Sequence, residues 1–268
     1  MVEPSPAGGR TERMNRRKLS VTVITLNEEV DIGACLDSVS WADEIVVVDS
    51  GSSDRTVEIA KKYTDKVFRH EWPGYAAQKN WAVAQASNDW ILSLDADERV
   101  PPPLQAEIKE VMTREAPSPG YYIARKNFFL GRWIRHGGWY PDHTLRLFDR
   151  KRGRFGERMV HEAVGIDGAP AYLENPMEHY TYRSLADYHE RAGRYASLAA
   201  AEMARNGRPF RFADLCARPL WTFCKMYIFQ QGFREGAQGF LLSALYGYYT
   251  FLKYAKLWEC KQARKKEA

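Results

Sequence analysis

Three acidic side chains follow a short apolar run near the middle of the chain. The run is Trp90 to Leu94, and Asp95, Asp97 and Glu98 come directly after it. A short apolar run that is soon followed by prolines predicts a buried strand. Side chains two residues apart on an extended chain point the same way, so we expect Asp95 and Asp97 to converge on one point. Converging carboxylates predict a Mg²⁺ or Mn²⁺ site completed by substrate phosphates, and a polar turn after a strand is the alternative.

The elements that would position these carboxylates are predicted by short β-branched runs that alternate with helical patterns. Strands are expected over 20–26, 44–49, 66–69 and 90–94, and helices over 29–38, 54–63 and 75–86. This β-α series predicts an α/β fold whose parallel sheet has right-handed crossovers. The carboxyl ends of parallel strands meet at one edge of the sheet, where open α/β folds bind ligands.

Polar clusters accompany the other predicted strands as well. They are Thr25-Leu-Asn-Glu-Glu29, Asp49-Ser-Gly-Ser-Ser-Asp-Arg-Thr56 and Gln78-Lys79-Asn80. Gly51 allows the backbone to turn closely, whereas Asp54 by itself is most simply the N-cap of the next helix. Taken together, the clusters predict a nucleotide site with a metal ion at its phosphate end.

The second half of the chain has a different pattern. A helix is expected over 104–114, strands over 121–130, 144–149 and 171–182, and further helices over 184–206, 210–231 and 236–258. We therefore predict a flexible tail over 1–18 and a mixed, mainly parallel α/β domain over 19–207. Within that domain, 19–100 would be the nucleotide half and 101–207 the acceptor half. A basic amphipathic helical region would occupy 208–268.

Positive charge is concentrated near the C-terminus. Residues 205–268 carry 12 Lys and Arg against 4 Asp and Glu, while residues 1–204 carry 27 against 30. The uncharged stretch 239–252 is shorter than the roughly 18–20 residues that cross a bilayer. Apolar and aromatic residues beside Lys and Arg predict helices that lie in a membrane interface and contact anionic lipid. The alternative is a helical pair that packs on the protein's own core.

The composition excludes several classes of protein. With 45% hydrophobic and 13% aromatic residues, the chain is not disordered. Its four cysteines form no C-x-x-C pair, so neither a disulfide framework nor a zinc site is expected. Residues 1–18 are polar and predict no secretory signal.

The ordered motifs resemble glycosyltransferase family 2, the inverting enzymes of the GT-A fold, over about residues 19–180. The motifs are T-L-N-E-E, V-V-D-S-G-S-S-D-R-T, Q-K-N and L-D-A-D-E. Residues 131–142, 145–148 and 160–162 are similar to the subgroup that adds a sugar to the lipopolysaccharide inner core, commonly described as β-1,4-glucosyltransferases. The resemblance implies transfer of a sugar, expected to be glucose from UDP-glucose, to a lipid-linked saccharide such as that core.

The resemblance also implies roles for single residues of the donor site. Thr25, Asn27 and Glu29 would line the nucleoside pocket. Asp49 would accept a hydrogen bond from the base, and Lys79 would approach the base or the diphosphate.

A divalent cation is the expected cofactor. By the resemblance, Asp95 and Asp97 form the metal motif, with Asp97 as the direct ligand. Some GT-A enzymes use a late histidine as a third ligand, and His161 in Val-His-Glu is the candidate. A lone histidine is otherwise most simply a structural residue.

Inverting transfer is one displacement at the anomeric carbon, and it needs a base opposite the leaving diphosphate. We predict that Asp142 is this base, because it follows the Gly-Gly-Trp-Tyr-Pro loop and because a comparable Asp serves as the base in the family. The chain has Pro141-Asp142 where many members have Glu-Asp. Glu162 is the reserve candidate, and a capping role for Asp142 is the alternative.

Cations and aromatic rings surround the predicted base. Aromatic faces pack on sugar rings and cations pair with phosphates, which suits a phosphorylated oligosaccharide acceptor. A solvated loop with a few packed Trp residues is the alternative. The acceptor residues expected are Arg132, Arg135, Trp139 and Arg146, with His136, Trp133 and Tyr140 beside them.

Two other functions remain open from the sequence. A polyprenyl-phosphate sugar synthase would share the nucleotide half but differ in its acceptor. A non-catalytic membrane- or nucleic-acid-binding protein would use the basic C-terminus, but it would have no need of converging carboxylate clusters. We expect no nucleic-acid partner, and we expect a cytoplasmic enzyme that is peripheral on the inner face of the bacterial inner membrane.

Overall fold

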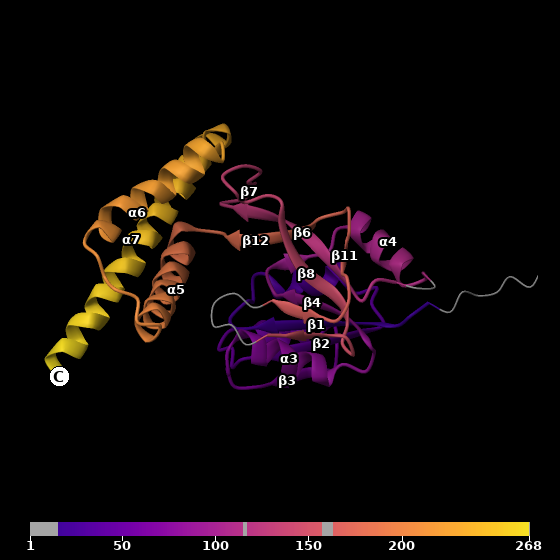
Figure 1. Cartoon of the computed structure of the whole chain (residues 1–268). Helices are drawn as coiled ribbons and strands as arrows, with labels where there is room; N and C mark the ends of the chain where they lie inside the picture. Colours follow the sequence, from indigo (N-terminus) through magenta and orange to yellow (C-terminus); the bar gives the residue numbers. More distant parts are fainter. Residues whose placement is uncertain (1–15, 115–116, 157–162, 268) are drawn as a thin grey trace, which may run out of the picture.

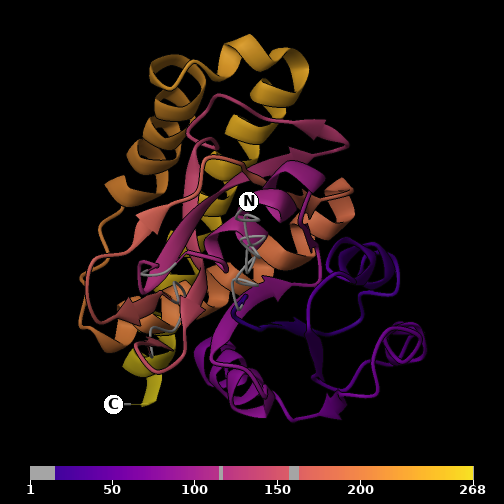
Figure 2. The same cartoon turned by 90° about the vertical axis from the view of Figure 1, so that its right-hand side faces the viewer.

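The computed structural model describes residues 16–114, 117–156 and 163–267. Its first part is a sheet flanked by helices, and its second part consists of α5 (Leu185–Arg205), α6 (Ala213–Cys224) and α7 (Gly236–Glu267). Strand β12 (Met177–Tyr182) leads from the sheet to these helices, which we call the helical unit (Figure 1). When the molecule is turned by 90°, the sheet lies in front of the helical unit (Figure 2).

The first part of the sheet has the parallel arrangement that the sequence predicts. Its strands run in the order β3-β2-β1-β4, and every neighbouring pair is parallel. The connecting helices begin later or end earlier than expected at some ends, but each predicted element is present. The strands are β1 (Leu19–Thr25), β2 (Glu44–Asp49), β3 (Val67–Arg69) and β4 (Trp90–Asp95), and the helices are α1 (Ile32–Ser38), α2 (Thr56–Ala60) and α3 (Tyr75–Gln85).

The second part of the sheet is mixed, as expected. From β4 the order continues β8-β6-β12-β5, with β8 antiparallel to both β4 and β6 and with β12 parallel to β6. Strands β7 and β11 also pair with β6. The new elements are β5 (Glu98–Arg99), α4 (Pro102–Val111), β6 (Gly120–Phe129), β7 (Arg132–Trp133), β8 (Asp142–Asp149) and β11 (Ala171–Tyr172).

Two predictions for this part were wrong in detail. The strand expected over 171–182 is interrupted, and β11 and β12 flank Pro176, which has no N–H for a strand ladder. A separate antiparallel pair, β9 (Gly153–Phe155) and β10 (Val164–Ile166), was not predicted. Strands of three residues are too short to show an alternating pattern.

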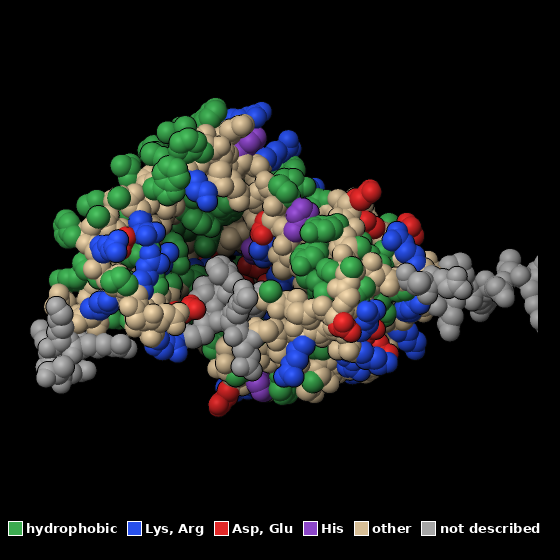
Figure 3. All heavy atoms as spheres, viewed as in Figure 1, with side chains coloured by type: hydrophobic (Ala, Val, Ile, Leu, Met, Phe, Trp, Pro, Cys, Tyr) green, Lys and Arg blue, Asp and Glu red, His purple; other side chains and the backbone are tan. Residues whose placement is uncertain are grey.

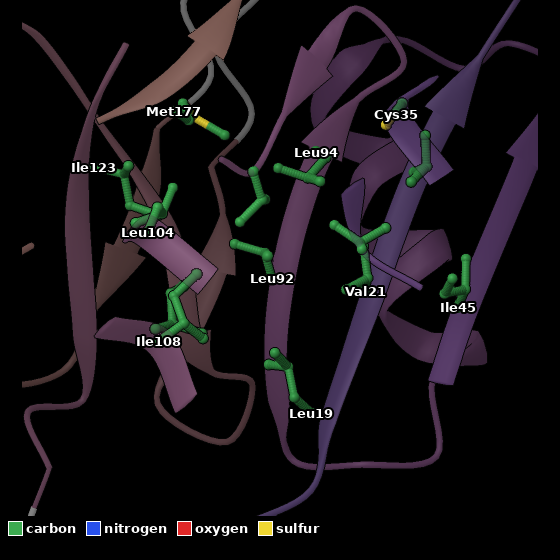
Figure 4. Packing of buried hydrophobic residues seen from close by; sticks show 14 of the residues in the cluster. Leu19, Val21, Cys35, Ile45, Leu92, Leu94, Leu104, Ile108, Ile123 and Met177 are labelled. Carbon is green, nitrogen blue, oxygen red and sulfur yellow. The ribbon is translucent and has the colours of Figure 1, made fainter. Parts of the chain in front are cut away.

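Helices cover both faces of the parallel strands. On one face, Val21 and Leu92 pack with residues of α1 and α4, and Leu104 and Ile108 of α4 lie beside Ile123 of β6 (Figure 4). On the other face, α3 and the β9-β10 pair cover β2 and β4. Burial on both faces explains why β2 is uninterruptedly apolar from Ile45 to Val48.

The helical unit has its own contacts. In α5, the Tyr188 hydroxyl donates a hydrogen bond of 2.7 Å to the Leu245 carbonyl of α7. Helix α6 continues into a π-helical turn, η1 (Lys225–Phe229), and a 3₁₀ turn, η2 (Gly232–Glu235), precedes α7. Residues of α5 and α7, among them Ala200 and Leu257, form a small buried cluster. The helix 184–206, which we expected inside the α/β domain, therefore packs against the C-terminal helices.

The outer surface of the helical unit is rich in exposed apolar side chains, which gather over it in Figure 3. Within the described residues, no helix has both the length and the apolar character needed to cross a membrane. The inner surface is buried, with Met226 and Leu242 in a cluster beside Trp139. We call the exposed large apolar side chains of residues 212–258 the apolar face, and they are Phe212, Leu220, Trp221, Ile228, Phe229, Phe233, Phe240, Leu241, Tyr248, Phe251 and Trp258.

Candidate active site

The loops that follow β1 and β2 are bound to each other. Thr25 and Asp49, the last residues of these strands, lie opposite one another in the parallel register. Asn27 has a left-handed backbone (φ 54°). Its side-chain oxygen accepts a 2.8 Å hydrogen bond from the Ser53 amide, and its own amide donates to the Ser52 hydroxyl at 2.8 Å. Two of the predicted clusters therefore form one structure at the sheet edge.

Other predicted donor residues lie in the same loops. Oδ2 of Asp49 accepts 2.9 Å hydrogen bonds from the Gly51 and Ser52 amides, and Gly51 has a φ of 100°. Glu29 is partly exposed and contacts Arg55 at 3.2 Å. Thr25 is buried, and its hydroxyl forms no hydrogen bond within the described residues. A buried hydroxyl of this kind requires an explanation, and a bound ligand is one.

Asp95 is held by two cations from different elements. Lys79 reaches Oδ1 at 2.9 Å from α3, and Arg146 reaches Oδ2 at 2.6 Å from β8. Burial by itself would raise the pKa of Asp95, but the charges of Arg146 and Lys79 outweigh it and hold the pKa well below its usual range. The sequence predicted the Gln-Lys-Asn group at this edge, and Lys79 arrives there although its side chain is only 1% exposed.

Asp97 has different neighbours. Its Oδ2 lies 3.5 Å from Nε2 of His179 and 3.4 Å from a guanidinium nitrogen of Arg191. His179 is on β12, opposite Glu98 of β5 in an antiparallel register. Burial would raise the pKa of Asp97, but His179 and Arg191 together lower it. This histidine is a functional candidate that sequence reasoning missed.

The chain turns at Ala96, between β4 and β5, and the carboxylates of Asp95 and Asp97 bind different partners. The two groups are close enough for the charge of Asp95 to raise the pKa of Asp97. Within the described residues, no group of three or more His, Cys, Asp or Glu side chains is arranged to hold a metal ion. A carboxylate and an imidazole can still bind Mg²⁺ or Mn²⁺ together with diphosphate oxygens, because such ions take few protein ligands. The predicted ligand His161 and the reserve base Glu162 lie outside the described residues.

An amide connects His179 to the predicted base. Oδ1 of Asn127 lies 2.7 Å from Nδ1 of His179, and Nδ2 of Asn127 donates to Oδ2 of Asp142 at 3.2 Å. An acceptor on Nδ1 favours the tautomer that leaves Nε2 free to bind a cation, as partners of metal-binding histidines do. Asn127 therefore fixes the orientation of both groups.

Asp142 lies at the start of β8 and is only partly exposed. Nε and a terminal nitrogen of Arg125 donate to its Oδ2 at 2.9 and 2.6 Å. Burial would raise the pKa of Asp142, but Arg125 and Asn127 lower it. The carboxylate is therefore ionised at neutral pH. Within the described residues, no hydrogen bond reaches its Oδ1, so that oxygen is available to accept a proton.

Arg146 differs from the expectation of an acceptor contact. It is 2% exposed, and its guanidinium contacts the carboxylates of Asp95 and Glu98. Glu98 is itself fully buried and accepts a 2.9 Å hydrogen bond from the Asp95 amide. Arg146 and Glu98 thus both contact Asp95, and the ion pair between them leaves neither buried charge uncompensated. The sequence analysis noted Glu98 as the third carboxylate after the strand, but its ion pair with Arg146 of β8 depends on how the strands pack.

A cavity of about 540 Å³ separates Asp142 and His179 from the helical unit. Figure 3 shows the hollow between the two parts of the molecule. The sheet side contributes Arg125, Asn127, Asp142 and His179, and the helical side contributes Trp221, Lys225, Gln230 and Tyr246, among others. Trp139 lines the cavity but is 7% exposed, and its ring packs against Phe129 and Tyr246. Most of the Trp139 ring is therefore core, which leaves little of it for stacking on a sugar.

The loop that carries Arg132, Arg135 and His136 is bound to the helical unit through Glu235. One oxygen of this buried carboxylate accepts from the amides of Arg135 and His136 at 3.0 and 3.1 Å and lies 2.6 Å from Nδ1 of His136. Arg132 contacts the other oxygen at 3.3 Å. Burial would raise the pKa of Glu235, but His136 and the two amides lower it.

The chain is similar to known proteins over most of its length. The profile of glycosyl transferase family 2 matches residues 20–169. The lipopolysaccharide core biosynthesis glycosyltransferase LpsC of Rhizobium meliloti is 30% identical over 90% of this chain and 92% of its own length. An uncharacterized glycosyltransferase of Rickettsia typhi is 30% identical over 91% of this chain and 87% of its own length.

Solved structures resemble the chain more distantly. A glucosyl-3-phosphoglycerate synthase from Mycobacterium tuberculosis is 22% identical, with a TM-score of 0.47 over 72% of this chain and 81% of that one. This likeness is too distant to add to the family assignment. The sheet found here, mixed and mainly parallel with helices on both faces, is GT-A-like, as predicted. From the profile and from the relatives that span nearly its whole length, the chain belongs to glycosyl transferase family 2.

Proposed function

We propose that this glycosyltransferase is metal-dependent and inverting, and that it moves glucose from UDP-glucose to a hydroxyl of a lipid-linked saccharide. The lipopolysaccharide inner core is the proposed acceptor, because the relative LpsC is a lipopolysaccharide core biosynthesis enzyme. Membership of a transferase family argues against the non-catalytic alternative.

One observation carries the proposal. Asn127 contacts both His179, which faces Asp97, and Asp142, and all of these except Asp97 line one cavity. A site for a cation that binds phosphates therefore lies next to an ionised carboxylate that can accept a proton. Displacement of a diphosphate by a hydroxyl needs both groups.

In the reaction, the acceptor oxygen forms a bond to the anomeric carbon as the bond from that carbon to the diphosphate breaks. Asp142 takes the hydroxyl proton at its Oδ1, while Arg125 and Asn127 hold Oδ2 and orient the carboxylate. Asp97 and His179 would hold the cation, which supplies positive charge at the leaving diphosphate. Attack from the side opposite the diphosphate inverts the anomeric configuration.

The donor would lie along the carboxyl ends of β1, β2 and β4. We propose that Thr25, Asn27 and Glu29 line the nucleoside pocket and that Asp49 accepts a hydrogen bond from the base. The bonds between Asn27, Ser52 and Ser53 support this, because they pre-form the loops. Lys79 and Asp95 would lie at the diphosphate end.

We propose that the helical unit binds the inner face of the bacterial inner membrane, on the cytoplasmic side. Its apolar face exposes Phe212, Leu220 and Phe229 by 75%, 64% and 67%. The net charge of residues 205–268 is positive, with 12 Lys and Arg against 4 Asp and Glu. Exposed aromatic groups with flanking cations are typical of interfacial helices. The same helices form a wall of the cavity, so a lipid-linked acceptor would enter it beside the bilayer.

The proposed function is tested by measuring UDP release and sugar transfer from radiolabelled UDP-glucose with Mn²⁺, with and without a lipopolysaccharide-containing membrane extract. We expect label to appear in the saccharide of the extract, and Asp142→Asn to slow that transfer by about 10²–10⁴-fold. Transfer of the labelled sugar from UDP-glucose to polyprenyl phosphate would instead favour the synthase alternative. Transfer that is unaffected by chelation of divalent ions would contradict the metal assignment.

A further inference from the structure

A second cavity lies next to the first. It has a volume of about 300 Å³ and is lined by Arg135, His136, Gly138, Tyr140, Phe229, Gln230 and Gln231. Gly138 and Gln230 line both cavities. The Gln230 amide lies directly against Gly138, since a Cβ at that glycine would be 2.6 Å from Nε2 of Gln230. The two cavities are therefore neighbours on either side of one contact.

The second cavity offers hydrogen-bond donors and positive charge. The Arg135 guanidinium lies over the Trp133 ring, 4.2 Å from its centroid, and forms no ion pair with a carboxylate among the described residues. His136, Tyr140 and the two glutamine amides add further hydrogen-bond donors. No Asp or Glu is among the residues that line this cavity. This is the chemistry of an oxyanion site.

The cavity is pre-organised by a residue outside it. Glu235 fixes the backbone of Arg135 and His136 and the ring of His136 through three contacts at its Oε1. The negative charge of Glu235 is therefore compensated by these contacts and by the Arg132 guanidinium. The Arg135 side chain takes no part in these bonds, and it remains exposed.

We propose that the second cavity is a subsite for a phosphate group of the acceptor saccharide, with Arg135 as its main ligand. One saccharide that reaches Asp142 in the first cavity would pass Gln230 and place its phosphate in the second. The proposal rests on the proposed function, because it assumes that the first cavity holds the acceptor. The guanidinium fork of Arg135 pairs with two phosphate oxygens, which a lysine cannot do equally well.

A phospholipid headgroup is the other source of a phosphate here. Phe229 lines the second cavity and also belongs to the apolar face. The shared lining by Gly138 and Gln230 favours the saccharide, because it connects this cavity to the one that holds Asp142. The two sources are separated by the test.

The test compares transfer to an acceptor purified from membranes with transfer to the same acceptor after phosphatase treatment, in neutral detergent. For the wild-type enzyme we expect dephosphorylation to raise the acceptor KM by about 10-fold or more, since charge-assisted hydrogen bonds are strong. Arg135→Gln should raise the KM for the phosphorylated acceptor similarly, with kcat little changed, and should leave the KM for the dephosphorylated acceptor unchanged. Arg135→Lys should be intermediate.

Arg211→Gln is the charge-matched control, since Arg211 is exposed on the helical unit and lines neither cavity. The subsite proposal would be wrong if dephosphorylation left the wild-type acceptor KM unchanged. It would also be wrong if Arg135→Gln raised the KM equally for both acceptors. Binding of Arg135→Gln to phosphatidylglycerol vesicles should equal that of the wild type, and a specific loss would assign the cavity to lipid. If the wild type transfers no sugar to either acceptor, the proposed function fails instead.

Discussion

Nε2 of His179 lies 3.5 Å from Oδ2 of Asp97, although 82 positions separate the two residues in the chain. The pair forms because β12 inserts between β6 and β5, which brings the last strand of the sheet next to the turn after β4. The Asp97–His179 pair therefore places a carboxylate and an imidazole together near the carboxyl end of β4.

Removing either member of this pair should impair metal binding. We expect Asp97→Ala to abolish metal-dependent donor binding and turnover, and His179→Ala to weaken Mn²⁺ affinity measured by calorimetry in the presence of UDP. His143→Ala is the matched control, because His143 is exposed on β8 and contacts Tyr172. Near-normal activity of Asp97→Ala at low Mn²⁺ would show that the metal assignment is wrong.

Asp142→Asn tests the base. Donor and metal affinity should stay near normal, because those contacts belong to other strand ends, while kcat and kcat/KM should both fall by about 10²–10⁴-fold. The Arg125 contact lowers the pKa of Asp142, so its ionised form should persist to acid pH and activity should fall only at or below the usual carboxylate range. Glu162→Gln is the comparison and should have a smaller effect. A larger loss of activity in Glu162→Gln than in Asp142→Asn would assign the base to Glu162. Loss of donor binding in Asp142→Asn would show that the loop 137–141 covers the nucleotide.

Arg146→Met should destabilise the fold. The methionine side chain would no longer pair with Asp95 and Glu98. Removing one member of a buried ion pair costs about 3–5 kcal/mol of stability. Urea denaturation measures this loss, and Arg154→Met, at an exposed position of β9, is the control. Unchanged stability with a higher acceptor KM would instead support the role that the sequence suggested for Arg146.

The apolar face should mediate membrane binding. We expect the triple variant Phe212→Ser, Leu220→Ser, Phe240→Ser to lose most of its affinity for vesicles that contain anionic lipid, since burial of each large apolar side chain contributes about 1.5–3 kcal/mol. These residues line neither cavity, so transfer to a detergent-solubilised acceptor should be retained. Tyr172→Ser, 62% exposed on β11, is the control. Salt should weaken binding by the wild type, and sedimentation of the triple variant with vesicles as well as the wild type would refute the assignment.

Glu44 should make stability depend on pH. Burial would raise its pKa, but hydrogen bonds from Lys66, Ser20 and Ser87 lower it from 4.5 to about 2. A lowered pKa gives stability that is present above the unfolded value and is lost as the pH falls from about 4.5 towards 2. We expect Glu44→Gln to reduce the free energy of unfolding by about 3 kcal/mol at pH 7 and by much less near pH 2. Glu58→Gln, whose side chain is 64% exposed, should show no such trend.

The sequence by itself determined the parallel half of the fold. Apolar runs of strand length separated by helical patterns specify β1 to β4, and the polar residues after them must lie at one edge because parallel strands share their carboxyl ends. The shared location of Thr25, Asp49 and Asp95 therefore follows from the order of strands and helices along the chain. The family motifs were sufficient to predict the enzyme class.

Only the tertiary structure decided the partners of those residues. No local pattern indicates that β12 lies beside β5, that Arg146 contacts Asp95, or that α6 and η1 form a wall of the cavity beside Asp142. Periodicity reports whether a side chain faces a core, but not which distant side chain it meets there. His179, Asn127 and Glu235 were missed for that reason, because each is defined by a contact across the fold, and such contacts form only when the sheet and the helical unit pack together.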